Sequence, residues 1–204
     1  MTRRPFILGL TGSIGMGKST TAGFFTECGI PVWDADSAVH RLYAKSGAAV
    51  GAVAGIWPKA VIDDVVDRAA LREWISTDNS AIKKLEAVIH PLVAQDRQTF
   101  ILAAQNRNEW LVVVDVPLLF ETGGDAYVDA ILVVTAPTDV QKARVLAREN
   151  MDVSLFAKIT EAQMPDAEKR KRADYTIETT SLDVAKADVV NLISELKQKV
   201  NDHA

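Results

Sequence analysis

The chain has 204 residues, of which 48% are hydrophobic and 25% charged, and its formal net charge is −4. These values are ordinary for a globular protein of one domain or two small ones, and they exclude the basic excess of a nucleic-acid-binding protein. No run approaches the ~20 apolar residues of a membrane helix, and no signal peptide is recognisable. The chain also has a single cysteine. We therefore expect a cytoplasmic protein with no nucleic-acid or membrane partner.

The first third of the chain predicts a strand, a helix and a second strand. The apolar run 6–10 is short and lies before a glycine-rich segment, which is typical of a buried strand. Residues 19–28 predict a helix that Gly29 ends, and residues 30–33 predict a strand that ends at an aspartate. Cys28, at the end of this helix, is expected to be a small buried residue.

Residues 37–109 are predicted to be mostly helical. Apolar residues within 85–92 follow the i, i+3, i+4, i+7 spacing of an amphipathic helix. Pro91 interrupts this pattern, so we expect a kink or a new helix start there.

The last part of the chain alternates between strands and helices. The runs 111–116 and 130–134 are rich in β-branched residues and do not alternate with polar ones, which is typical of strands covered on both faces. A helix is predicted over 139–148, a last strand over 175–177, and a final helix that includes 189–200. The order of elements predicts an α/β doubly wound fold, whose ligands bind at the carboxyl ends of the strands.

Residues 12–19 read GSIGMGKS and match the phosphate-loop pattern GxxxxGK(S/T), between a predicted strand and a predicted helix. Glycines let the backbone N–H groups turn toward phosphates, and the lysine adds a full positive charge. The alternative, a glycine turn that binds nothing, leaves the lysine and serine unexplained. The residues predicted to bind the nucleotide phosphates are Gly12, Gly15, Met16, Gly17, Lys18, Ser19 and Thr20, with Ser19 also in the shell of a Mg²⁺ ion.

Three aspartates follow predicted strands. Asp34 and Asp36 are alternate residues and share a face if the extended chain continues. One of them is expected to accept the proton of an attacking hydroxyl, preferably Asp34, and the other to bind substrate or metal-bound water. Asp115 is placed to join the Mg²⁺ shell. The alternatives are a helix N-cap for either of the first two and a locally satisfied carboxylate for Asp115.

Two arginines and a histidine are further candidates. Arg144 and Arg148 are spaced i, i+4 before a polar stretch that suits a mobile lid, where an arginine neutralises charge on a transferred phosphoryl group. The alternative is a solvated helix face. The charged run 168–172 predicts a solvated helical end, and His90 is by spacing alone more typical of a structural histidine.

Taken together, these motifs resemble the dephospho-CoA kinase family. The resemblance spans nearly the whole chain and rests on the phosphate loop, Asp34-Ala35-Asp36, His90-Pro91, the segment 115–121 (DVPLLFE), Gln163 and Ala173-Asp174. It implies one P-loop kinase domain over 1–204 with three layers and a five-stranded parallel sheet, a helical substrate-binding region over 37–109 and a lid over 148–172.

The resemblance also implies an activity: transfer of a phosphoryl group from ATP, with Mg²⁺, to the ribose 3′-hydroxyl of dephospho-CoA, the last step of coenzyme A synthesis. Asp34, Lys18 and Arg148 would be catalytic, and Arg144 would bind the nucleotide. The residues expected to bind the CoA-type substrate are Asp36, His90, Pro117, Leu118, Leu119 and Glu121.

The chain departs from the family pattern at Ser13 and Met16, which are variable positions of the phosphate loop, so phosphate binding is expected to be kept. Near the last strand, residues 178–181 replace the usual Asn-x-Gly. This change concerns the adenine side of the site. Another small-molecule P-loop kinase, acting on a nucleoside, nucleotide or sugar acid, is an alternative. A GTPase-type switch is disfavoured because the guanine motif NKxD is absent.

Overall fold

The computed structural model describes residues 3–202 and divides into two compact units. Of the described residues, 3–33 and 104–202 form the first, here called the core unit, and Asp34–Ala103 form the second, here called the helical unit. No helix within the described residues is long and apolar enough to cross a membrane.

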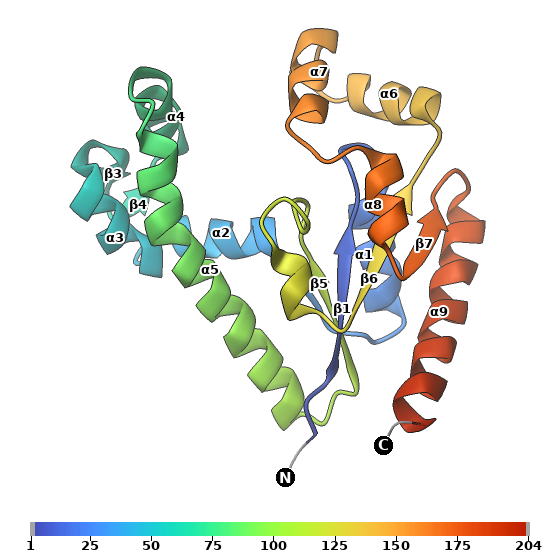
Figure 1. Ribbon diagram of the computed structural model, residues 1–204. Helices are drawn as coiled ribbons and strands as arrows, with labels where there is room; N and C mark the ends of the chain where they lie inside the picture. Colours follow the sequence, from blue (N-terminus) through green and yellow to red (C-terminus); the bar gives the residue numbers. More distant parts are fainter. Residues whose placement is uncertain (1–2, 203–204) are drawn as a thin grey trace. The chain divides into compact units, whose positions relative to one another are not determined.

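A five-stranded sheet organises the core unit, in the order β2-β5-β1-β6-β7 (Figure 1). Strand β1 pairs in parallel with both β5 and β6, and β6 pairs in parallel with β7. The strands are β1 (Phe6–Thr11), β2 (Val32–Asp34), β5 (Leu111–Asp115), β6 (Ala130–Thr135) and β7 (Tyr175–Glu178). The predicted α/β fold with a five-stranded parallel sheet is therefore confirmed.

The strands are buried because both faces of the sheet are covered. All five residues of β5 are buried, as are the first five of β6. A core strand with two apolar faces gains hydrophobic stabilisation from every side chain, which explains the absence of alternation in its sequence.

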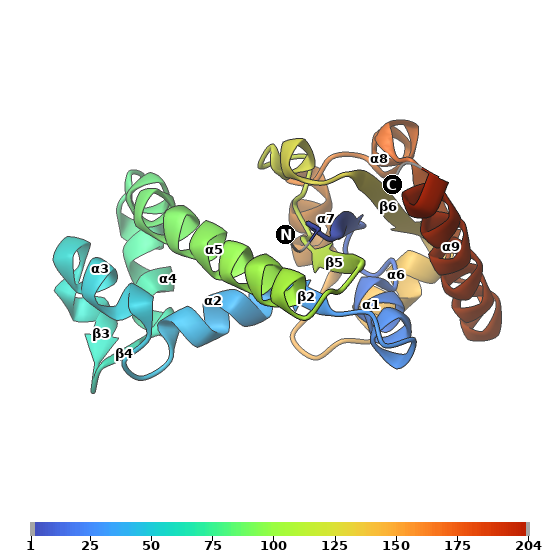
Figure 2. The ribbon, with the colours of Figure 1, turned by 90° about the horizontal axis from the view of Figure 1, so that it is seen from below.

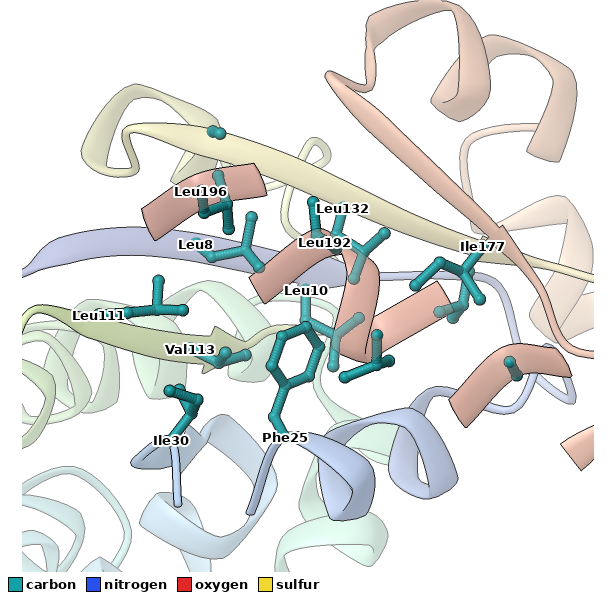
Figure 3. Close-up of a cluster of buried hydrophobic side chains, with 14 of the residues drawn as sticks. Leu8, Leu10, Phe25, Ile30, Leu111, Val113, Leu132, Ile177, Leu192 and Leu196 are labelled. Carbon is teal, nitrogen blue, oxygen red and sulfur yellow. The ribbon is translucent and has the colours of Figure 1, made fainter. Parts of the chain in front are cut away.

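Helices α1 and α9 cover one face of this sheet (Figure 3). Phe25 of α1 and Leu196 of α9 are fully buried and pack with Leu8, Leu10 and Leu132 of the central strands. On the other face, Ile131 and Val133 of β6 pack with Leu119 and Phe120 from the segment after β5. The helices of the core unit are α1 (Lys18–Glu27), α6 (Thr138–Leu146), α7 (Val153–Glu161), α8 (Asp166–Arg172) and α9 (Leu182–Asp202).

Two details of these helices differ from the sequence-based predictions. Cys28 caps the end of α1 and is exposed, so its predicted burial is wrong, because the chain reverses at Gly29 with a φ of 76° on the surface. The run 168–172 is not simply solvated. It ends α8, and the Lys169 side chain within it is fully buried.

The helical unit, whose backbone is drawn in Figure 2, has a hydrophobic core of its own. The indole rings of Trp57 and Trp74 stack with centroids 5.0 Å apart, and Leu42, Val53 and Leu71 pack in the same cluster. Its helices are α2 (Ala35–Tyr43), α3 (Ala48–Ile56), α4 (Arg68–Thr77) and α5 (Ala81–Asn106), with the short strands β3 (Val61–Ile62) and β4 (Val65–Val66) between α3 and α4.

One local feature of the helical unit was not predicted, and one of the two outcomes expected at Pro91 is excluded. Strands β3 and β4 form an antiparallel hairpin whose turn residues, Asp63 and Asp64, have φ values of 51° and 63°. Such values are those of a two-residue hairpin turn, for which aspartate is suited, so the Asp-Asp pair was the available signal. Helix α5 continues through Pro91 without a new start, because only the one N–H of that residue is missing from the helix ladder.

Truncation of Leu196 should test the packing of α9 on the sheet. Leu196→Ala is expected to lower the free energy of unfolding by about 2–5 kcal/mol, because it leaves a cavity beneath a fully buried side chain. Val190→Ala, on the same helix at a side chain 46% exposed, is the control and should change it by about 0.5 kcal/mol or less. Urea unfolding of both variants measures the difference. Equal effects would show that α9 does not contribute to the core as described.

Candidate active site

The phosphate loop joins the carboxyl end of β1 to the N-terminus of α1. Gly15 and Gly17 have φ values of 80° and 84°, in the left-handed region that favours glycine. Residue 12 has no room for a side chain, because a Cβ there would lie 2.6 Å from Cγ2 of Val134. No side chain within residues 3–202 caps α1, so the N–H groups of its first turn remain available to an anion.

Side chains from three distant segments hold the loop. The Gln141 amide nitrogen donates to the carbonyl of Ile14 at 2.8 Å, and the Ile14 N–H donates to Oε1 of Gln163 at 3.1 Å. The Thr179 hydroxyl donates to the carbonyl of Met16 at 2.9 Å. The Met16 side chain is buried in the core cluster and accepts a hydrogen bond from the N–H of Ala136. The loop conformation is thereby imposed by its surroundings.

Lys18 and Asp115 form an ion pair next to the loop. The Lys18 ammonium donates to Oδ1 of Asp115 at 2.5 Å, and the two side chains are 14% and 3% exposed. The parallel pairing of β1 with β5 causes this approach, because it aligns the carboxyl ends of the two strands. The pair provides one cation for a phosphate and one carboxylate for a metal ion at the same edge of the sheet.

A pocket of about 220 Å³ adjoins the loop. Arg144 reaches it from α6, and its guanidinium donates to the hydroxyl of Thr179 at 2.9 Å and to the Thr179 carbonyl at 2.6 Å. Arg148 is exposed and lies two residues beyond the end of α6, so it is not on the helix face predicted from i, i+4 spacing. The lining residues are Gly15, Gly17, Thr20, Thr21, Phe24, Arg144, Arg148, Thr179, Leu182 and Ala185.

Thr179 is a site residue that the sequence analysis missed. Its side chain is buried, it bonds the loop carbonyl of Met16 and the guanidinium of Arg144, and its N–H donates to the carbonyl of Thr135. A Cβ on Gly17 would lie 2.8 Å from the Thr179 hydroxyl, so the loop packs directly on this residue. The only sequence signal was that residues 178–181 depart from the Asn-x-Gly pattern.

The segment after β5 is anchored to the sheet and to α8. The carbonyl of Pro117 accepts a hydrogen bond from the Thr11 hydroxyl at 3.1 Å. The Leu119 side chain is fully buried, whereas Leu118 is 39% exposed. Of the predicted substrate-binding side chains in this segment, the structure therefore presents Leu118 to solvent and places Leu119 in the core.

Glu121 has two partners, the buried side chain of Lys169 and the backbone of Met164. It forms an ion pair with Lys169 at 2.9 Å and accepts a hydrogen bond from the N–H of Met164 at 2.7 Å. Burial raises the pKa of Glu121, but the hydrogen bonds from Lys169 and Met164 outweigh this effect, and the net pKa lies below the usual value. Glu121 is therefore ionised at neutral pH and joins this segment to α8.

Asp34, Asp36 and His90 belong to the helical unit. Helix α2 begins at Ala35, so the expectation that Asp34 and Asp36 share a face of an extended chain is wrong. The Asp34 side chain caps this helix, accepting the Ser37 N–H on Oδ1 at 2.6 Å. Asp36 lies exposed in the first turn of α2, and His90 is exposed on α5.

The loop, its lysine and the parallel sheet define a P-loop kinase. A shikimate kinase from Bacteroides thetaiotaomicron shares this fold at a TM-score of 0.52 and 16% identity, over 95% of this chain and 98% of that one. The protein TT1252 from Thermus thermophilus is more similar, with a TM-score of 0.80 and 34% identity over 95% of this chain and 99% of that one.

The family follows from the sequence relatives. The family model described as dephospho-CoA kinase matches residues 6–183. A dephospho-CoA kinase from Cereibacter sphaeroides is 53% identical over 96% of this chain and 98% of its own length, and one from Jannaschia sp. is 52% identical over 95% and 98%. The chain belongs to the dephospho-CoA kinase family, as its motifs predicted.

Replacing Thr179 should test its role in holding the loop. Thr179→Val conserves the shape but removes the hydroxyl that bonds Met16 and Arg144, so the free energy of unfolding should fall by about 1–3 kcal/mol. Thr180→Val is the control, because Thr180 is exposed and bonds only Glu178. Chemical denaturation checks both variants. If they behave alike, the Thr179 hydroxyl does not hold the loop.

Proposed function

We propose that this protein transfers the γ-phosphoryl group of ATP to the ribose 3′-hydroxyl of dephospho-CoA, the last step of coenzyme A synthesis. The observation that carries the proposal is a complete phosphate loop, Lys18 included, in a chain whose relatives with about half its residues identical are named dephospho-CoA kinases. Because ATP is the donor and the one cysteine is unpaired, the proposal includes the cytoplasm as the location.

The donor half of the reaction belongs to the core unit. The N–H groups of the loop and of the first turn of α1 would bind the phosphates, and Lys18 would bind the β- and γ-phosphate oxygens. Arg144 is held by two hydrogen bonds and would bind the nucleotide beside Thr20. The Arg148 side chain has no hydrogen-bond or ion-pair partner among the described residues, so its guanidinium is available to the transferred phosphoryl group.

The residues near the loop fit a Mg²⁺ ion. Mg²⁺ usually takes one or two protein oxygens, with water and substrate phosphate filling the rest of its shell. The Ser19 hydroxyl and the Asp115 carboxylate are oxygen ligands of this kind, and Asp115 already lies beside Lys18. Bound there, the ion would neutralise charge on the phosphate oxygens.

The acceptor half would use Asp34 as the base. Its Oδ1 is fixed by the cap of α2, whereas Oδ2 has no partner among residues 3–202 and can accept the proton of a hydroxyl. Asp36 lacks such a fixed orientation, so its proposed role is substrate binding.

Other residues complete the proposed acceptor site. In the helical unit, His90 and the region 37–109 are proposed to bind dephospho-CoA. In the core unit, the segment from Pro117 to Glu121 is likewise proposed to contact this substrate. The region 148–172 would act as a lid. Within it, the Gln163 side chain accepts a hydrogen bond from the Ile14 N–H of the phosphate loop. Movement of this region would therefore change a hydrogen bond that holds the loop.

Loss of Lys18 should abolish most turnover. Lys18→Ala is expected to lower kcat about 10²–10³-fold, because it removes the positive charge next to the transferred group. Lys142→Ala, at an exposed lysine of α6, is the control and should retain full activity. ADP release with ATP, Mg²⁺ and dephospho-CoA measures both, after thermal melts show that each variant is folded. An active Lys18→Ala enzyme would contradict phosphoryl transfer at this loop.

The base can be identified from a pair of isosteric variants. Asp34→Asn should keep the helix cap and nucleotide binding but lose about 10²–10⁴ in kcat, because an amide caps a helix but cannot take the proton. Asp36→Asn should mainly raise the KM for dephospho-CoA. The reverse pattern would assign the base to Asp36, and an intact rate in both would place it elsewhere.

The acceptor itself is tested by a panel of dephospho-CoA, shikimate, nucleosides and sugar acids. We expect strong ADP release with dephospho-CoA alone. Turnover of a different acceptor would leave the assignment as a P-loop kinase in place but contradict dephospho-CoA as the substrate.

A further inference from the structure

The helical unit contains a cavity of about 490 Å³. Helices α2, α4 and α5 line it, and all of its lining residues belong to the helical unit. They are Asp36, Val39, His40, Tyr43, Arg68, Leu71, Arg72, Ile75 and Leu85.

The cationic side chains of this cavity have no carboxylate partner among residues 3–202. Arg68 lies over the ring of Tyr43, 5.6 Å from its centroid, and neither Arg68 nor Arg72 forms an ion pair within the described residues. Most other arginines in the described part of the chain are held by carboxylates or by Thr179. These are Arg4, Arg41, Arg107, Arg144, Arg170 and Arg172.

The spacing of the two arginines suits an extended anion. Arg68 and Arg72 are four residues apart on α4, so they lie on the same side of one helix. A guanidinium binds phosphate oxygens through two parallel hydrogen bonds, and stacking on Tyr43 reduces the freedom that Arg68 would lose on binding. Asp36 is the one carboxylate of the lining, so the cationic groups outnumber it.

The remaining wall is apolar with one hydroxyl. Val39, Leu71, Ile75 and Leu85 supply hydrocarbon surface. Burial raises the pKa of the Tyr43 phenol, against the opposing effect of the Arg68 charge, so Tyr43 is a neutral hydrogen-bond donor at neutral pH. An organic diphosphate with an extended chain attached matches both surfaces.

We propose that this cavity binds the acceptor through its diphosphate, with Arg68 and Arg72 on the phosphate oxygens and the apolar wall against the attached chain. The assignment rests on the proposed function, because dephospho-CoA is the diphosphate considered. It adds to that function the residues that recognise the part of the acceptor remote from the reacting hydroxyl. Arg68 and Arg72 are thus specificity residues and take no part in the transfer itself.

The experiment compares Arg68→Ala, Arg72→Ala and Arg72→Lys with wild type, and uses Lys83→Ala on α5 as the control. Losing a charge-assisted hydrogen bond should raise the KM for dephospho-CoA about 10–100-fold, with kcat and the KM for ATP changed about twofold or less. The KM of Arg72→Lys should lie between those of wild type and Arg72→Ala, because lysine keeps the charge but lacks the two parallel N–H donors of the guanidinium. Lys83→Ala should match wild type. Thermal melts verify that each variant is folded.

A second measurement uses inorganic pyrophosphate as the probe. It should inhibit the wild-type enzyme competitively against dephospho-CoA, and the Arg68→Ala, Arg72→Ala double variant should lose that competition. Wild-type turnover of dephospho-CoA with unchanged KM in the arginine variants would overturn the cavity assignment and leave the function standing. No wild-type turnover of dephospho-CoA would overturn the function, and this assignment with it.

Discussion

The phosphate loop depends on hydrogen bonds that it cannot make by itself. A loop that turns its N–H groups toward one ligand directs its carbonyls elsewhere, and buried carbonyls need donors. Gln141 and Thr179 supply those donors to Ile14 and Met16. Both come from the second half of the chain, so the loop reaches its working shape only when β6, α6 and β7 are in place.

Buried charges in the core unit, like the buried carbonyls of the loop, have partners from other segments. Lys18 and Lys169 are both largely buried, and each has a carboxylate within 3 Å, Asp115 at 2.5 Å and Glu121 at 2.9 Å. A buried charge without a partner is strongly destabilising, so these pairs fix where the two lysines point. One pair adjoins the phosphate loop and the other ties the segment after β5 to α8. The first is chemically useful because a phosphate can replace the carboxylate as partner of Lys18.

The helical unit solves a different problem. It has its own core, built on the stacked rings of Trp57 and Trp74. Polar groups on its surface therefore do not reduce the hydrophobic packing of the five-stranded sheet. Asp34 marks the junction, since it ends β2 and caps α2 with one oxygen. The cap orients the carboxylate at no cost in packing. The two arginines of the cavity, Arg68 and Arg72 on α4, remain without carboxylate partners within the described chain.

By itself, the sequence determined the buried strands, the loop and the family, because each depends on residues close together in the chain. Unalternating β-branched runs, two left-handed glycines and a lysine at fixed spacing are local signals. Tertiary structure alone decided that Thr179 and Gln163 support the loop, that Lys169 is buried and that Leu119 lies in the core. These outcomes depend on which distant segments come into contact. The identity of a single threonine, lysine or leucine does not indicate which residue it will contact in the folded chain.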